Sequence, residues 1–238
     1  MAMNKPNVVV LTGAGISKES GLSTFRDLDG IWANVDINDV ATPTAFYNNS
    51  ENVHDFHNTL RSKVLSDSVK PNAAHYALAK LEETWPENIQ VITQNIDNLH
   101  ERAGTENLIH MHGEILKARC TYCGWIRSCW TGLDSNDLCA SCEMEAFMRP
   151  HVVWFGETPL DMPRIYSALD ECDIFVSIGT SANVFPAAEF ISLVKKRKTV
   201  RTIEINLERS EKTDEFTDAR HGLASELVPI FVEEILKL

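Results

Sequence analysis

Short apolar runs alternate with segments of helical periodicity along most of this chain. Four of the runs are rich in β-branched residues, end near turn-forming residues and predict buried parallel strands, at residues 7–11, 87–93, 174–178 and 200–205. The segments with helical patterns lie at residues 73–83, 161–169, 187–196 and 227–238. This alternation predicts an α/β fold built on a doubly wound parallel sheet.

Two stretches depart from this pattern. Residues 36–68 are polar with helical character, and residues 118–147 contain closely spaced cysteines. We interpret both as insertions that form a smaller second domain. The expected division is a discontinuous larger domain of residues 1–35, 69–114 and 150–238, with a helical module at 36–68 and a metal-binding module at 115–149.

Composition narrows the class of partner. The 34 acidic and 22 basic residues give a formal net charge of −12, which argues against binding to a phosphate backbone and suits basic peptides better. No apolar run approaches the roughly 18 residues that a bilayer crossing requires. The N-terminus lacks a signal-peptide core. We therefore expect a cytoplasmic monomer with neither nucleic-acid nor membrane partners.

Four of the six cysteines form two C-x-x-C pairs separated by fifteen residues, namely Cys120, Cys123, Cys139 and Cys142. This spacing is typical of a tetrahedral zinc site, and four thiolates leave no open position for water. The sequence therefore predicts a structural zinc. The other two thiols, Cys129 and Cys172, are expected to serve packing.

A glycine-rich turn follows the first predicted strand. Gly13, Ala14 and Gly15, followed by Ser17, could bring backbone close to a pyrophosphate, although Lys18 stands where a dinucleotide fingerprint has its third glycine. A plain strand-to-helix turn is the alternative. The polar continuation at residues 21–26 suits a loop folded over a cofactor, with Arg26 near phosphates and Phe25 over the glycosidic carbon; a solvated loop is the alternative.

Amides and carboxylates gather after the second strand, at residues 94–98. Because ligands of open α/β sheets bind at the carboxyl ends of strands, we favour function here over a helix cap by Asn95 or Asp97. His112, before a glycine at a domain junction, suits a general base rather than a packing residue or ligand. His110 looks structural.

Three further segments are less specific on their own. The run at 151–157 is apolar and could be core or groove. The segment of Gly179, Thr180 and Ser181 follows a strand and offers donors to phosphate. Asn206, at the end of the fourth strand, could hold a ribose or form a turn.

Taken in order, these motifs resemble the sirtuins, the NAD-dependent protein-lysine deacylases, over nearly the whole chain. The resemblance implies a large Rossmann-like domain, a small zinc-bearing domain, and a cleft in which NAD and acyl-lysine meet. It implies NAD contacts at Gly13, Ala14, Gly15, Ser17, Phe25, Arg26, Gln94, Asn95, Ile96, Asp97, Gly179, Thr180, Ser181, Asn206 and Ala224. Within that set, Asn95 and Asp97 would grip the nicotinamide carboxamide.

The resemblance also implies the acyl-lysine site and the chemistry. Val153 and Phe155 would line the tunnel, while Gly156 with Glu157, and the stretch at Val184, would pair with the substrate backbone. The acyl oxygen would displace nicotinamide, with Asn95 and His112 as catalytic residues. His112 would take a proton from the ribose hydroxyls, giving free lysine and O-acyl-ADP-ribose.

One departure concerns the acyl pocket. The compact core is similar to the branch that removes succinyl and malonyl groups and carries a Tyr-x-x-Arg pair, but this chain has His57 and Leu60 at those places. Leu60 cannot pair with a carboxylate, and Arg61 would point about 100° away on a helix. We therefore expect neutral acyl groups, acetyl first, to be preferred.

Two other functions fit parts of the sequence. A mono-ADP-ribosyltransferase on the same fold would let a protein nucleophile intercept the activated ribose. A zinc-ribbon nucleic-acid-binding module is disfavoured by the acidic balance.

Overall fold

The larger sheet has six parallel strands. The computed structural model describes residues 5–24 and 35–238. The strand order is β3-β2-β1-β7-β8-β9, and every pairing is parallel. The strands are β1 (Val8–Thr12), β2 (Ile89–Thr93), β3 (Leu108–His110), β7 (Ile174–Ile178), β8 (Arg201–Asn206) and β9 (Asp218–His221). The order reverses direction between β1 and β7, which confirms the doubly wound sheet; ligands of such sheets bind at this point, outside the carboxyl ends of the strands.

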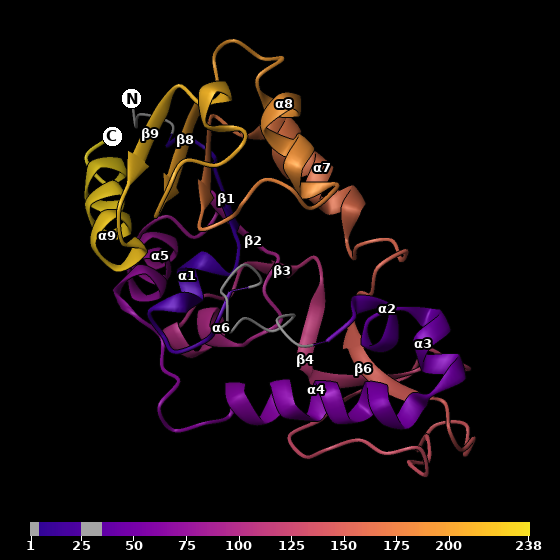
Figure 1. The fold of residues 1–238 in the computed structure, drawn as a ribbon. Helices are drawn as coiled ribbons and strands as arrows, with labels where there is room; N and C mark the ends of the chain where they lie inside the picture. The colour runs from indigo at the N-terminus through magenta and orange to yellow at the C-terminus, as the bar shows by residue number, and fades with distance from the viewer. Residues whose placement is uncertain (1–4, 25–34) are drawn as a thin grey trace.

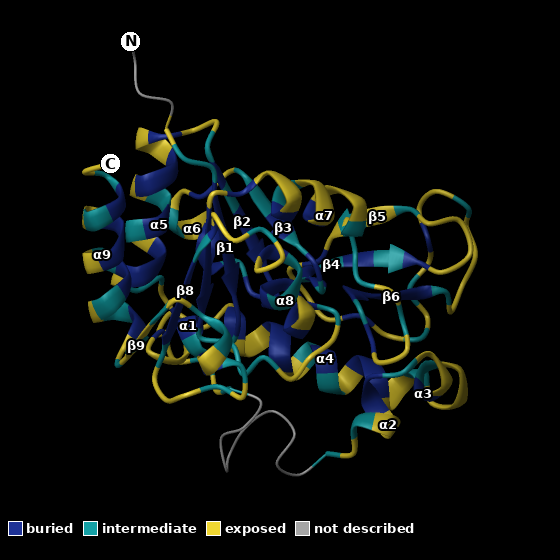
Figure 2. Ribbon diagram, turned by 90° about the horizontal axis from the view of Figure 1, so that it is seen from above, coloured by how far each residue is buried: buried dark blue, intermediate teal, exposed yellow. Residues whose placement is uncertain are grey.

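Helices cover both faces of this sheet (Figures 1 and 2). Along β1, Val8 and Val10 face the core shared with α5 (Ala73–Thr84) and α9 (Ala224–Ile235). Val9 and Leu11 face the opposite core, with α7 (Met162–Glu171) and α8 (Phe190–Val194). Because both faces are covered, β1 and β7 are buried along their whole length.

A smaller antiparallel sheet stands apart from the first (Figure 1). Its order is β5-β4-β6, with β4 at Gly113–Cys120, β5 at Ile126–Ser128 and β6 at Met148–Val152. The helices α2 (Ile37–Val40), α3 (Pro43–Asn48) and α4 (Ser50–Val64) share one apolar core with β4 and β6. A second small core lies around the cysteines.

The sequence patterns located the central elements within a few residues but misjudged others. The expected helix at 227–238 begins at Ala224 and ends at Ile235, with Pro229 inside it. The segment at 187–196 is a 3-10 turn, Ala187–Glu189, followed by α8. Short elements were missed, among them α1 (Gly15–Lys18), α6 (Leu99–Ala103) and a 3-10 turn at Thr213–Glu215. None of the described helices is both long and apolar enough to cross a membrane.

Candidate active site

The loops that leave β1, β2 and β7 lie together at the carboxyl edge of the larger sheet. Gly13 N donates to Ile178 O at 2.9 Å, and Gln94 N donates to Thr12 O at 2.9 Å. The first residue of each of these two loops therefore donates a backbone hydrogen bond to the end of the neighbouring strand. The residues expected at the cofactor site therefore meet where the strand order reverses.

Three glycines allow the β1 and β7 loops to touch. Gly15 N donates to Gly179 O at 2.8 Å. A side chain on Gly13 would lie 2.8 Å from Gly179 O, and one on Gly15 would lie 2.7 Å from the Cα of Gly179. Gly179 itself has φ of +61°, a conformation that favours glycine. The resulting turn carries no bulky side chain, which suits close approach of a pyrophosphate.

Ser17, Asn95 and Asp97 form a buried polar group between the β1 and β2 loops. Asn95 Nδ2 donates to Ser17 Oγ at 3.1 Å and to Gly13 O at 3.1 Å. Ser17 Oγ donates to Asp97 Oδ2 at 3.0 Å. Burial raises the pKa of Asp97, while hydrogen bonds from Leu99 N and Ser17 and the charge of His110 oppose that rise. The group can present both an amide and a carboxyl to a ligand.

Thr180 joins the two sides of the crevice. Gln94 Nε2 donates to Thr180 Oγ1 at 3.0 Å, and Asn206 Nδ2 donates to Thr180 O at 2.9 Å. Thr180 thereby links Gln94, which follows β2, to Asn206 at the end of β8. Ser181 follows in the same loop, and Ala224 is the first residue of α9.

His112 has the hydrogen bonding of a base. Its Nδ1 lies 3.1 Å from Gln94 O, and a carbonyl only accepts, so Nδ1 carries the proton. Nε2 then carries a lone pair, to which none of the described residues donates a hydrogen bond. Burial lowers the pKa of His112, outweighing the bond to Gln94, so the ring is neutral near physiological pH. Asn95 and Asp97, on the loop after β2, therefore lie at the same edge of the sheet as His112, which follows β3.

Gly113 holds His112 against β6. A Cβ atom on Gly113 would lie 2.1 Å from His151 O, and the φ of Gly113 is +79°. Val153 N donates to His112 O at 2.9 Å, so the run after β6 starts beside the histidine. Phe155, two residues on, is half exposed and is held by its backbone, since its N donates to Ala41 O at 3.0 Å. Val184 is also exposed.

His57 and Leu60 are buried in the core that α4 shares with the smaller sheet. His57 Nδ1 lies 2.8 Å from Val53 O and therefore donates, while Nε2 accepts from Trp154 Nε1 at 3.2 Å. Burial lowers the pKa of His57 to about 4. The ring is thus neutral, and both of its nitrogens are already engaged.

The burial of two arginines, Arg61 and Arg149, was not predicted from the sequence. Arg149 stacks with its Cζ 3.2 Å from the centre of the Trp154 ring and donates to Glu157 Oε1 at 2.6 Å. Glu157, expected at the substrate backbone, therefore has its carboxylate engaged with an arginine. Arg61, expected to point away from the acyl site, is 2% exposed and donates from Nε to Ile115 O at 3.1 Å. Burial of a charged side chain has no signature in a single sequence.

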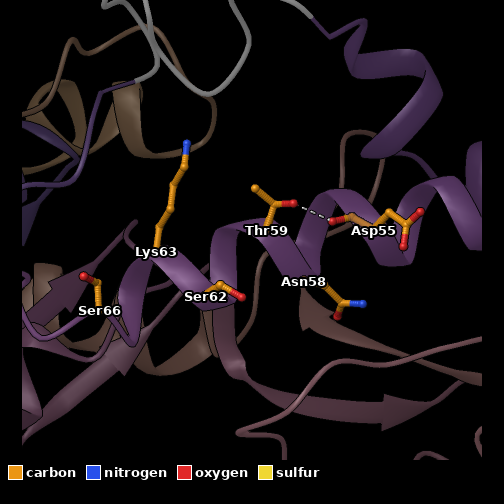
Figure 3. A pocket seen from close by; sticks show the side chains of 6 residues that line it. All are labelled: Asp55, Asn58, Thr59, Ser62, Lys63 and Ser66. Carbon is orange, nitrogen blue, oxygen red and sulfur yellow. Dashed lines mark hydrogen bonds between the residues drawn. The ribbon is translucent and has the colours of Figure 1, made fainter.

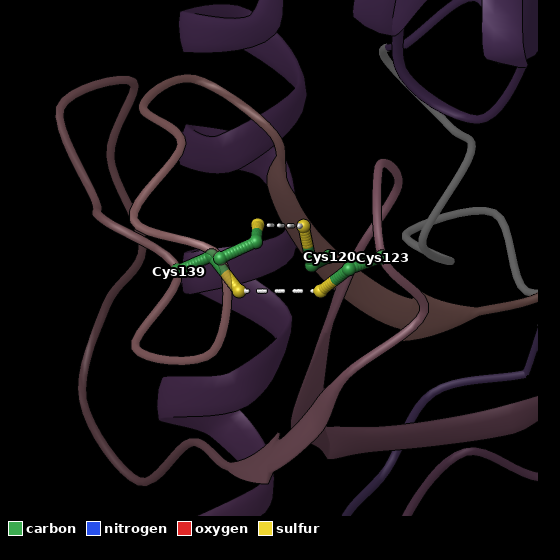
Figure 4. Close-up of side chains that lie close together, drawn as sticks. Cys120, Cys123 and Cys139 are labelled. Atoms are coloured by element: carbon green, nitrogen blue, oxygen red, sulfur yellow. Dashed lines mark hydrogen bonds between the residues drawn. The ribbon is translucent and has the colours of Figure 1, made fainter.

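The four cysteines converge between β4 and the loop before β6 (Figure 4). All four sulfurs lie within 4.8 Å of one another, with Cys120 and Cys142 3.8 Å apart and Cys123 and Cys139 3.6 Å apart. A tetrahedral zinc with Zn–S bonds of about 2.3 Å places its sulfurs about 3.8 Å apart. The cluster therefore fits a closed four-thiolate site.

Two other parts of the candidate set stand apart. Phe25 and Arg26 lie outside the described residues. A hollow on the outer side of α4 is lined by polar side chains of that helix and the turn after it (Figure 3), namely Asp55, Asn58, Thr59, Ser62, Lys63 and Ser66. It contains none of the residues expected to bind NAD or acyl-lysine.

Comparisons with known proteins agree with this geometry. The Sir2 family profile matches residues 13–186. A Vibrio cholerae serotype O1 protein named NAD-dependent protein deacylase is 53% identical over 236 residues, which cover 99% of this chain and 96% of that relative. A solved Sir2 homologue–NAD complex superposes with a TM-score of 0.86 at 35% identity, covering 97% of this chain and 90% of the other.

A second solved structure contains a peptide. The Sir2–p53 peptide–NAD⁺ complex superposes with a TM-score of 0.79 at 32% identity, covering 96% of this chain and 92% of the other. The family profile spans well over half of the chain, and the relative's identity extends over nearly all of it. The order of motifs from the glycine turn to the β7 loop thus has its explanation: the chain belongs to the Sir2 family, the sirtuins.

Proposed function

We propose that this chain is an NAD-dependent protein-lysine deacylase that passes the acyl group to ADP-ribose. The single observation that carries the proposal is a neutral His112 beside the buried Ser17–Asn95–Asp97 group, with an Nε2 lone pair that no described residue engages. The name of the Vibrio cholerae relative and the NAD and peptide complexes of the solved relatives support it.

The loops at the crevice would hold the dinucleotide. The glycine turns would lie against its pyrophosphate without bulky side chains, and Thr180 and Asn206 would contact its adenosine half. Asn95 and Asp97 would hold the carboxamide, whose N–H groups can donate to their side-chain oxygens. Bound NAD supplies an activated ribose carbon and a cationic leaving group. Ala14, Ile96, Ser181 and Ala224, with Phe25 and Arg26, complete the proposed set.

His112 would act as the general base. Its Nδ1–H is fixed by Gln94 O, so Nε2 can accept a proton from a ribose hydroxyl. The zinc site would take no part in proton transfer, because four thiolates close its coordination shell.

The test is an NAD-dependent assay on an acetyl-lysine peptide with His112→Ala. We expect turnover to fall by at least about a hundredfold, since general-base catalysis contributes that much, while NAD binding by calorimetry persists. His221→Ala, an exposed histidine on β9, is the matched control and should keep wild-type turnover. Turnover of the His112 variant at the control level would overturn the assignment.

The preference among acyl groups follows from two side chains of α4. His57 is neutral and fully engaged, and Leu60 offers no charge, so a terminal carboxylate would be desolvated without a partner at these positions. We propose that acetyl and other neutral acyl groups are removed faster than succinyl. Values of kcat/KM on one peptide carrying each group would test this, and a higher value for succinyl would refute it.

We also propose the two-domain division stated above. The sheet of β1 and the sheet of β4 have separate apolar cores, and the helical module packs on the latter. The six cysteines of the chain are all free, which suits a reducing compartment such as the cytoplasm.

A further inference from the structure

One backbone segment is bonded at every carbonyl. The four successive carbonyls of residues 93–96, which include the carboxamide-binding loop, each accept a hydrogen bond from the segment 110–115. The donors, in order, are Met111 N at 3.0 Å, His112 Nδ1 at 3.1 Å, His110 Nδ1 at 3.3 Å and Ile115 N at 2.9 Å. Two histidine rings therefore take part in fixing the loop.

His110 differs from His112 in its second nitrogen. Its Nε2 lies 2.9 Å from Glu101 Oε1, on α6. The carbonyl of Asn95 and the carboxylate of Glu101 both accept, so each bond needs a proton on the ring. The geometry is therefore satisfied by the imidazolium, whereas the neutral ring could make only one of the two bonds.

The charges around the ring favour the same form. The side chain of His110 is 10% exposed. Burial lowers its pKa, but the hydrogen bond and charge of Glu101, the charge of Glu114 and the bond to Asn95 outweigh burial, and the pKa is raised above its usual value. The charged or titratable groups that face the ring are Glu101 and His100 from α6, Glu114 from β4 and Asp97 from the loop.

Two of the groups around the His110 ring, His100 and Glu114, have defined states of their own. His100 is kept neutral by burial, which holds its pKa well below the usual value. Glu114 is paired with Lys117, whose Nζ lies 2.6 Å from Glu114 Oε1. Burial raises the pKa of Asp97, and the charges of His110 and Glu101 act on it in opposite directions, that of His110 lowering it and that of Glu101 raising it.

We propose that His110, as an imidazolium held by Glu101, is a positioning residue of the deacylase reaction that fixes the Asn95 carbonyl and so the loop that carries Asn95 and Asp97. This inference rests on the proposed function. The cationic ring acts through the loop and does not touch the reacting atoms.

The same cluster could be considered as a metal site. The ligand atoms of Glu101, His110 and Glu114 lie within 4.8 Å of one another. A ring protonated on both nitrogens has no lone pair for a metal, and the ammonium of Lys117 already occupies Glu114. The hydrogen-bonded imidazolium accounts for the geometry without a second ion.

The first test is an NMR titration of the His110 ring in the zinc-loaded full chain, with Glu101→Gln and the control Glu87→Gln. Glu87 is exposed, and the change removes the same charge far from the ring. We expect His110 to titrate above the usual histidine pKa in wild type and control, and lower in Glu101→Gln. Titration of wild-type His110 below the usual value, or no change in Glu101→Gln, would overturn the proposal.

The second test is the pH profile of nicotinamide exchange. Since the cation is needed, kcat/KM for NAD should fall on the basic side, and Glu101→Gln should move that fall to lower pH. At a pH between the two midpoints we expect about a fivefold loss, the worth of one hydrogen bond. His110→Gln should remove the basic fall, because the glutamine amide can still donate to the Asn95 carbonyl but does not titrate.

If His110 had only a structural role, Glu101→Gln and His110→Gln would lower the rate by the same factor at every pH. That result would refute the proposal. The two hypotheses can fail separately. If the wild-type chain shows no NAD-dependent turnover, the proposed function fails, while the titration still reports the charge of His110.

Discussion

Replacing Asn58 by alanine should loosen the cysteine loop. Asn58 lies on α4, and its amide makes a double contact with Leu133: Nδ2 donates to Leu133 O at 2.8 Å, and Oδ1 accepts from Leu133 N at 2.9 Å. Oδ1 also accepts from Arg61 Nη1 at 2.6 Å. One side chain thus ties the helix that carries His57 and Leu60 to the loop between the two cysteine pairs.

The structure gives the size of the effect. The two bonds to Leu133 are together worth about 1 kcal/mol after partial rehydration, and loss of a partner for the buried Arg61 guanidinium costs about 2 kcal/mol. Within residues 5–24 and 35–238, Arg61 Nη2 has no hydrogen-bond partner, so the guanidinium has no spare contact there to compensate. A total of about 3 kcal/mol corresponds to a fall in Tm of about 6–12 °C for a domain of this size.

The assay is thermal unfolding of the zinc-loaded protein, followed together with release of zinc to a chromogenic chelator. Ser62→Ala, an exposed change on the same helix, is the matched control and should shift stability by less than about 0.5 kcal/mol. Asn58→Asp keeps Oδ1 and should lose less than Asn58→Ala. Equal Tm values for Asn58→Ala and Ser62→Ala would refute this reasoning.

Three further predictions concern the same small sheet. Verified removal of zinc should abolish turnover and open the cysteine loop to proteolysis while the larger sheet keeps its far-UV signal; full activity of the metal-free protein would contradict a bracing role. The double change His57→Tyr and Leu60→Arg should raise kcat/KM for a succinyl peptide about tenfold or more relative to acetyl, as measured on matched peptides, because a guanidinium then meets the carboxylate. The pKa of Glu157 is lowered, since its bonds from Arg149 and Trp154 N outweigh burial, so the pair stabilises the fold above pH 4.5. That contribution should be lost as pH falls below this value through the folded-state pKa, and Glu157→Gln should flatten the acid limb of stability against pH.

The central strands could be predicted because burial on both faces leaves a strong signal. Residues 174–178 are apolar except for Ser177, and the observed β7 has the same bounds. The edge strands β3 and β9 have three and four residues and lie beside only one neighbour, so their sequences are mixed and were missed. The start of α9 was placed three residues late because Pro229 was taken as a mark of the first turn.

The site was predictable where chemistry depends on residue type at fixed spacing. The cysteine pairs and the loop at 94–97 are local in sequence, and the structure places each set together. Contacts between distant segments were not predictable. The bond between Trp154 and His57 joins residues 97 positions apart, and no periodicity or motif links them. The charge of His110 likewise depends on Glu101, which a separate helix supplies.

Strand β4 connects two regions of very different chemistry. It begins at Gly113, directly after His112, the proposed base, and ends at Cys120, the first of the four thiols. Its pairing with β6 is irregular between Glu114 and Ala118, so at about 3.3 Å per residue the strand spans at most about 23 Å. Loss of the ion would release the far end of the element that carries the imidazole. Its earliest effect should be misalignment at the sugar hydroxyls, well before the parallel strands come apart.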